Sequence, residues 1–131
     1  MRLLLDTQYI IWLFHDIARV TDAERRVLEA PESTIHVSAV SFWEINLKSS
    51  LLHLSGDRKL NVDAENTLTL AHSAGWNVLP LSARHATAIL REPLSHRDPF
   101  DQMLMVQAQE EGLRLLTRDK KLQSHPIAFS A

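Results

Sequence analysis

Short apolar runs alternate along the chain with longer segments in which apolar residues recur at helical spacing. The apolar runs predict short strands at residues 2–5, 76–79 and 113–116, and the alternation of polar and apolar residues from Thr34 to Val37 predicts a further one. The helical spacing predicts helices at residues 7–14, 22–30, 61–74, 82–90 and 99–111, and a further helix after Ser41. Because strands that alternate with helices form parallel sheets, we expect an α/β fold with a small parallel β-sheet flanked by helices, an α/β/α sandwich.

Residues that commonly start or stop helices lie at the ends of several of these segments. Ser41 and Glu44 have the spacing of a capping box, in which the two side chains satisfy backbone amides at a helix start. Asp98 followed by Pro99 is a favourable start for the helix 99–111, and Gly112 is a favourable stop. The sequence therefore predicts these boundaries from local chemistry alone.

The length and composition indicate one domain. A chain of 131 residues, 45% of them hydrophobic, is close to the commonest domain size, and no linker or repeat divides it. We therefore expect one domain over residues 1–131. The absence of cysteine excludes disulfides and thiolate metal sites and suits a reducing cytoplasm. No signal peptide and no apolar run near the ~20 residues of a membrane span is present, so a cytoplasmic protein with no membrane partner is expected.

The charge balance restricts how a nucleic acid would bind. Sixteen acidic and fourteen basic residues give a formal net charge of −2, whereas strong non-specific nucleic-acid binders usually carry a basic excess. A nucleic acid would therefore be held by a local patch or by metal ions.

Four acidic residues are candidates for a shared site. Asp6 and Asp119 each follow an apolar strand, and Glu44 and Asp101 are each expected in the first turn of a helix. In a parallel sheet these positions meet at the carboxyl edge. Each acid also has a local interpretation, as a helix cap, a dipole partner or a turn residue.

The four acids together favour a metal site. Two like charges ~5 Å apart repel by about 3 kcal/mol at an effective dielectric constant of about 20. A divalent cation would neutralise such a cluster, and oxygen ligands suit hard Mg²⁺ or Mn²⁺.

The segments that carry these acids resemble the acidic motifs of a known nuclease family. LLLDTQYIIWLF, VSFWEINLK, HRDPFDQMLMVQA and LLTRDKKL, in this order, look like the motifs of PIN-domain ribonucleases. The similarity is greatest to the VapC-type toxins of type II toxin–antitoxin pairs, and it extends from Leu3 to about Leu122. It implies a single PIN-like domain that cleaves RNA phosphodiesters, a small antitoxin protein as partner, and a homodimer.

The resemblance also implies roles for individual residues. It makes four residues the catalytic and metal-binding set, as direct or water-mediated ligands of Mg²⁺ or possible Mn²⁺: Asp6, Glu44, Asp101 and Asp119. Asp98 would support this set or cap its helix. The hydroxyls of Thr7 and Thr117 would orient a carboxylate or a water, or cap strand ends. Four basic residues flank the motifs and would meet the RNA backbone or remain solvated surface charges: Arg97, Arg118, Lys120 and Lys121.

Some positions depart from the family pattern or have ordinary explanations. Gln8 and Gln102 stand where such toxins often have histidine and arginine, which leaves substrate contacts open. The seven histidines show no metal-binding spacing, so packing or surface positions are expected, with His96 the exception because it adjoins an acidic motif. Trp12 and Trp43 are expected in the core.

Two other functions remain as alternatives. A non-catalytic adaptor with the same fold would bind RNA or protein without cutting, which the retention of all four acids disfavours. A receiver-like signalling domain needs paired acids after the first strand and an acceptor aspartate at the end of the middle strand. Asp6 stands alone and the strand 76–79 ends in Leu79–Pro80, so this alternative is disfavoured.

Overall fold

The computed structural model describes residues 1–50, 62–95 and 97–131, and they form a five-stranded parallel sheet with helices on its faces. The strands lie in the order β3-β2-β1-β4-β5 and are β1 (Arg2–Leu5), β2 (Thr34–Ser38), β3 (Asn77–Leu79), β4 (Arg114–Leu116) and β5 (Ala128–Phe129). The helices are α1 (Thr7–His15), η1 (Ile17–Arg19), α2 (Asp22–Glu29), α3 (Ala39–Ser50), α4 (Ala64–Ser73), α5 (Ala83–Thr87) and α6 (Pro99–Glu111). The predicted α/β class with a parallel sheet is confirmed.

The central strand β1 determines which chain segments meet at the carboxyl edge of the sheet. β1 pairs with β2 on one side and with β4 on the other, in parallel. In the register of the second pair Leu5 lies opposite Leu116, so β1 and β4 end side by side. The residues that follow these two strands are therefore neighbours, although more than 100 positions separate them in the sequence.

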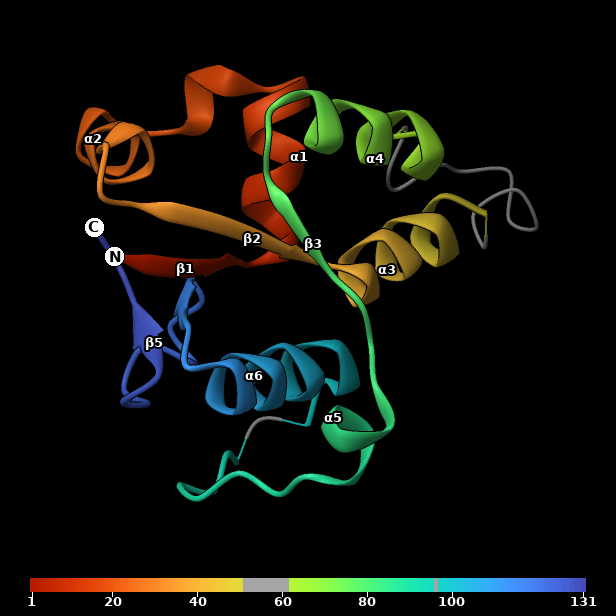
Figure 1. The fold of residues 1–131 in the computed structure, drawn as a ribbon, viewed down its shortest axis with the longest axis vertical. Coiled ribbons are helices and arrows are strands. Elements are labelled where there is room, and N and C mark those ends of the chain that lie inside the picture. Colours follow the sequence, from red (N-terminus) through yellow and green to blue (C-terminus); the bar gives the residue numbers. More distant parts are fainter. Residues whose placement is uncertain (51–61, 96) are drawn as a thin grey trace.

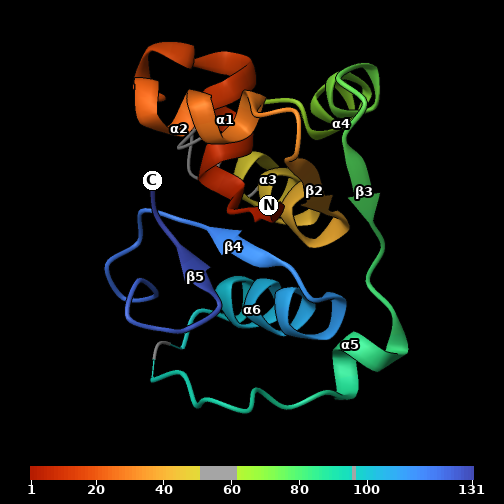
Figure 2. The same ribbon diagram turned by 60° about the vertical axis from the view of Figure 1, so that its left-hand side comes forward.

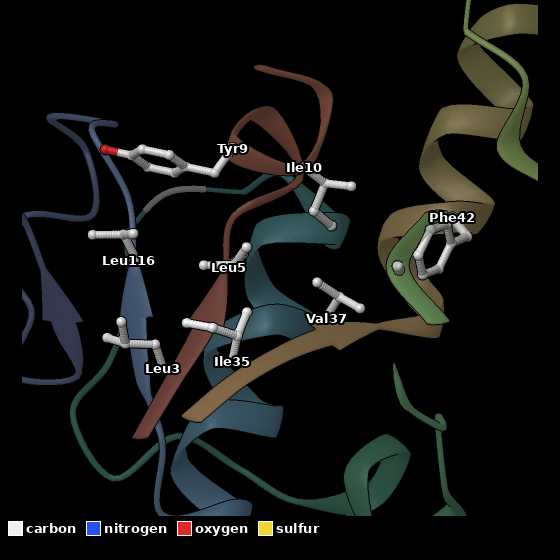
Figure 3. Packing of buried hydrophobic residues seen from close by; sticks show 9 residues of the cluster. Leu3, Leu5, Tyr9, Ile10, Ile35, Val37, Phe42 and Leu116 are labelled. Carbon is white, nitrogen blue, oxygen red and sulfur yellow. The ribbon is translucent and has the colours of Figure 1, made fainter. Parts of the chain in front are cut away.

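Successive residues of β1 pack on opposite faces of the sheet, as expected for an extended strand. Leu3 and Leu5 belong to one apolar cluster with residues of α1, and Leu4 belongs to a second with residues of α6. Figure 1 shows α1, α2 and α4 over one face and α6 with α5 on the other, and Figure 2 shows the same two layers. The first cluster is drawn in Figure 3.

Helix ends follow the predicted capping chemistry at several places. Thr21 accepts a hydrogen bond from the amide of Glu24 at the start of α2, at 3.1 Å. Gly112 ends α6 with a φ of 66°, the left-handed conformation that glycine adopts without steric cost. The predicted helix 61–74 is present as α4 from Ala64, and its expected first residue lies outside the described part of the chain.

The capping box predicted at Ser41 is wrong because α3 begins at Ala39, three residues before the expected first helical residue. The hydroxyl of the preceding Ser38 accepts a hydrogen bond from the amide of Val40 at 3.0 Å. Ser41 is thus inside the helix, and Glu44 lies beyond the first turn. The predicted placement of Glu44 in a first turn is wrong for the same reason.

The helix predicted at 82–90 is shorter than expected. α5 ends at Thr87, and Ile89, expected to pack, is 86% exposed. The side-chain amide of Gln109 donates to the carbonyl of Ile89 and accepts from the amide of Arg91, so α6 binds this backbone in an extended form. The short strand β5 was not predicted. Among the described residues, no helix has the length and apolar character needed to cross a membrane.

Candidate active site

A pocket of about 540 Å³ lies where β1 and β4 end. Its wall includes residues from the ends of both strands and from α1, α3 and α6. The charged residues of its lining are Asp6, Glu44, Lys48, Asp98, Asp101, Arg118 and Asp119. All four acids predicted as metal ligands therefore line one pocket.

Thr117 connects the two acids at the strand ends. Its hydroxyl donates to Oδ2 of Asp6 at 2.6 Å and accepts from the amide of Asp119 at 3.0 Å. The amide of Asp6 donates to the carbonyl of Leu116, which extends the β1–β4 pairing by one residue. Asp6 stands at the N-cap position of α1, but its side chain makes no capping hydrogen bond. A backbone hydrogen bond with Gln8, in the first turn of α1, nevertheless lowers the pKa of Asp6, so the side chain keeps a contact with the helix start, as its capping interpretation expects. Thr117 orients a carboxylate, one of the two roles expected for it.

The environment of Asp6 disfavours its charged form. Burial raises the pKa of Asp6 to about 6, and the hydrogen bond from Thr117 opposes this rise only in part. The negative charges of Asp101 and Glu44 contribute to this rise. The three carboxyl groups thus interact electrostatically across the pocket.

Glu44 is held by a lysine one helical turn away. The side chain of Glu44 is 8% exposed, and Nζ of Lys48 donates to its Oε2. Partial burial lowers the pKa of Lys48. The hydrogen bond and charge of Glu44, together with the negative charges of Asp98 and Asp101, outweigh this effect, so the net pKa of Lys48 is raised. Sequence reasoning missed Lys48, although its spacing of four residues from Glu44 on a helix was a usable signal.

Asp98 and Asp101 have different positions at the start of α6. Oδ1 of Asp98 accepts hydrogen bonds from the amides of Phe100 at 2.8 Å and Asp101 at 3.2 Å. The predicted cap is thus confirmed. Asp101 lies in the first turn of the helix, as predicted, and lines the pocket.

Asp119 follows β4 in a tight turn. Its Oδ1 accepts from the amide of Lys121 at 2.9 Å, which agrees with its interpretation as a turn acid. Asp119 nevertheless lines the pocket. Thr7, by contrast, donates its hydroxyl to Oγ of Ser41 at 2.8 Å, so it joins α1 to α3 instead of orienting a pocket carboxylate.

The predicted basic residues separate into two groups. Arg97, Lys120 and Lys121 are exposed and are not part of the pocket lining. Arg118 lines the pocket, but its Nε and Nη2 donate to the two carboxylate oxygens of Glu24 at 2.7 and 2.8 Å.

The side chains that contact Arg118 come from α1 and α2. Its guanidinium carbon lies 4.4 Å from the ring centre of Trp12. Glu24 is 2% exposed; burial raises its pKa, but the hydrogen bond and charge of Arg118 prevail, and the net pKa is lowered. No sequence signal identified Glu24 as a partner of Arg118.

The other residues singled out from the sequence have structural positions. His85 and His125 are buried and hydrogen-bonded, as the packing interpretation expects. His96 lies outside the described residues. Trp12 is partly buried against the core, but Trp43 is 57% exposed, so its predicted core position is wrong. The ring of Trp43 contacts the ring of Phe100, with 5.5 Å between the ring centroids.

The pocket offers hard oxygen donors, but no complete set of metal ligands is in place. Within the described part of the chain, no three His, Asp or Glu side chains are arranged to hold a metal ion together. Mg²⁺ commonly takes one or two carboxylates and keeps several waters, so a partial set is compatible with it. The repulsion of the Asp6 carboxylate by Asp101 and Glu44, which raises the pKa of Asp6, is compatible with a divalent cation at this place.

Comparisons with known proteins agree on the fold. The model of the PIN domain family matches residues 3–127. No curated protein matches the chain in sequence.

Solved structures of similar fold span nearly the whole chain. A toxin–antitoxin complex from Klebsiella pneumoniae has 23% identity and a TM-score of 0.64, covering 97% of this chain and 95% of that one. VapBC2 from Rickettsia felis, bound to a DNA fragment from its promoter, has 15% identity and a TM-score of 0.62, with coverage of 100% and 98%. VapBC-1 from nontypeable Haemophilus influenzae has 17% identity and a TM-score of 0.57, with coverage of 100% and 97%. At these identities the likeness shows a shared fold.

Proposed function

Because the chain belongs to the PIN-domain family, we propose that it is a metal-dependent endoribonuclease that acts as the toxin of a VapC-type toxin–antitoxin pair. One observation carries this proposal: four acids from separate segments line a single pocket, and the charges of two of them raise the pKa of a third. A carboxylate that only caps a helix gains nothing from like-charged neighbours.

In this proposal the four acids hold Mg²⁺, with Mn²⁺ as the alternative ion. Asp6, Glu44, Asp101 and Asp119 bind it directly or through water, and phosphate oxygens of the RNA complete its ligands. When bound, the metal supplies polarisation of the phosphate and a lowered pKa of the attacking water.

The chain's own groups orient these ligands. The Thr117 hydroxyl orients the Asp6 carboxylate by donating a hydrogen bond to its Oδ2. The same hydroxyl accepts a hydrogen bond from the amide of Asp119 and so holds the turn that carries this acid. Asp98 caps α6 through two amides and so presents Asp101 at the helix start.

The partners in the proposal are an RNA substrate, a small antitoxin protein and a second copy of the chain. The similar structures from Klebsiella, Rickettsia and Haemophilus are toxin–antitoxin assemblies, which supports the antitoxin. We expect the protein to act in the cytoplasm. Co-purification with the product of a short reading frame immediately upstream, with loss of RNA cleavage in the complex, would support the pairing.

Cleavage of RNA by the purified chain tests the proposal. Wild type and Asp101→Asn are incubated with total cellular RNA in Mg²⁺ or EDTA, and new RNA ends are mapped. We expect defined new ends only with wild type and metal. Asp22→Asn, an exposed acid of α2 outside the pocket lining, is the matched control and keeps full activity. Equal cleavage by Asp101→Asn, or no cleavage by wild type, would overturn the proposal.

The second candidate function is a non-catalytic adaptor that binds RNA or protein. The observation in its favour is that no three acids among the described residues are positioned to hold a metal together. An adaptor would bind RNA without producing new ends, whether or not Mg²⁺ is present. The same incubation therefore separates the two candidates.

A further inference from the structure

We propose that Lys48 is the residue of this pocket that binds a phosphate of the RNA strand. The inference rests on the proposed function for the nature of the ligand. It assigns to Lys48 a role that the family resemblance implied for four other basic residues: Arg97, Arg118, Lys120 and Lys121.

Two cations line the pocket in the described part of the chain, Lys48 and Arg118. Arg118 donates through Nε and Nη2 to both carboxylate oxygens of the buried Glu24, and Nη2 also donates to the carbonyl of Arg19. Its guanidinium also lies against the ring of Trp12. Three of its five N–H donors are thus engaged, and turning the guanidinium toward a phosphate would break its pair with a buried carboxylate, which is costly. Arg118 is therefore a structural cation of the pocket wall.

Lys48 has the opposite environment. Its side chain is 52% exposed, while that of its partner Glu44 is 8% exposed. An ammonium group has three N–H donors, of which the contact with Glu44 takes one. Lys48 can therefore donate to a second anion without leaving Glu44.

The position of Lys48 suits a phosphate next to the acids. It lies one helical turn after Glu44 on α3 and lines the same pocket as Asp6, Asp101 and Asp119. A polyanion entering a pocket with four carboxylates is repelled unless a cation accompanies it. Lys48 supplies a fixed positive charge there, and the chain's net charge of −2 supplies no general attraction.

Binding of a short labelled single-stranded RNA tests the inference. Fluorescence anisotropy measures Kd in Mg²⁺ for Asp101→Asn, which does not cut the probe, with and without Lys48→Gln, at several salt concentrations. Glutamine can still donate to Glu44 but carries no charge, so the variant separates phosphate binding from the holding of Glu44. Lys48→Arg keeps the charge, and Lys120→Gln removes an exposed charge outside the pocket lining. Thermal melts verify that each variant is folded.

We expect Lys48→Gln to raise Kd about tenfold, the effect of one lost charge-assisted hydrogen bond. The slope of log K against log salt should become shallower by about 0.7, the value for one phosphate on a single strand. Lys48→Arg should restore both quantities, and Lys120→Gln should leave Kd nearly unchanged.

An unchanged Kd and salt slope in Lys48→Gln would overturn the inference. A second result would also overturn it: Lys48→Gln, introduced into the wild-type protein, abolishes RNA cleavage while the salt slope of binding stays unchanged. This result would mean that Lys48 only holds Glu44. If wild type cuts no RNA but the binding series behaves as expected, the nuclease proposal fails and the role of Lys48 stands. A protein that binds no RNA at all would overturn both.

Discussion

Replacement of Asp6 by asparagine should stabilise the metal-free protein at neutral pH. The pKa of Asp6 in the folded protein is about 6, against an ordinary value of 3.8, mainly because of burial, with added repulsion from Asp101 and Glu44. A raised pKa means that the folded state binds the proton more tightly than the unfolded state does. Asp6 therefore favours folding fully below pH 3.8, and this contribution is lost as the pH rises through 6.

The magnitude follows from the size of the pKa difference. A rise from 3.8 to about 6 corresponds to about 3 kcal/mol of lost unfolding free energy at pH 7 and above. At pH 4 the loss is below about 1 kcal/mol, because Asp6 is then protonated in the folded state and only partly ionised in the unfolded state. An asparagine side chain at this position would carry no charge at any pH and could still accept from the Thr117 hydroxyl.

Urea unfolding in EDTA at several pH values measures the effect. Asp6→Asn should exceed wild type by up to about 3 kcal/mol at pH 7.5, equivalent to roughly 10 °C in Tm, and the gap should nearly close at pH 4. Asp22→Asn, at an exposed acid without such neighbours, should show no comparable pH-dependent gap. If the proposed metal site is correct, addition of Mg²⁺ should raise the Tm of wild type more than that of Asp6→Asn, because the metal would bind the ionised folded form.

A variant no more stable than wild type at pH 7.5 would refute this reasoning. So would a gap that is the same at pH 4 and pH 7.5, because a pH-independent gain would come from packing and not from ionisation of Asp6.

Two further substitutions probe the parts of the fold that support the pocket. Glu24→Gln should lower the unfolding free energy by about 2 kcal/mol in urea melts, less than for a fully buried pair because the Arg118 side chain is 36% exposed. The loss should shrink as the pH falls through the lowered pKa of Glu24, and an equal loss at pH 7 and pH 3 would contradict this. Leu115→Ala should cost about 2–5 kcal/mol in the same assay, because Leu115 is fully buried on β4 against α6, and a loss below 1 kcal/mol would mean that this layer repacks.

The fold was predictable to the extent that local patterns determine it. The apolar run at 2–5 and the alternating segment at 34–37 each predicted a strand, and both are strands. The end of α5 was not predictable, because it depends on hydrogen bonds from Gln109, which is distant in sequence. The start of α3 was misjudged because Ser38 and Ser41 are both acceptable caps, and only the end of β2 at Ser38 decides between them.

The candidate site was predictable in its acids but not in its cations. Acids directly after strands of a parallel sheet must meet at one edge, which accounts for Asp6 and Asp119. The partners of Arg118 depend on how α2 packs against the end of β4, and no local pattern contains this information. The sequence therefore predicted for Arg118 a contact with the RNA backbone or a solvated surface position, whereas its guanidinium is paired with the buried Glu24.

The four acids are positioned by two different kinds of contact. Asp6 and Asp119 are related by hydrogen bonds at the strand ends, since the amide of Asp6 donates to the carbonyl of Leu116 and the side-chain hydroxyl of Thr117 joins both acids. Glu44 and Asp101 lie on different helices, so their spacing depends on how α3 packs against α6. The rings of Trp43 and Phe100, each the sequence neighbour of one of these acids, meet edge to face at 5.5 Å. Trp43, although 57% exposed, thus contacts α6 directly beside the two acids.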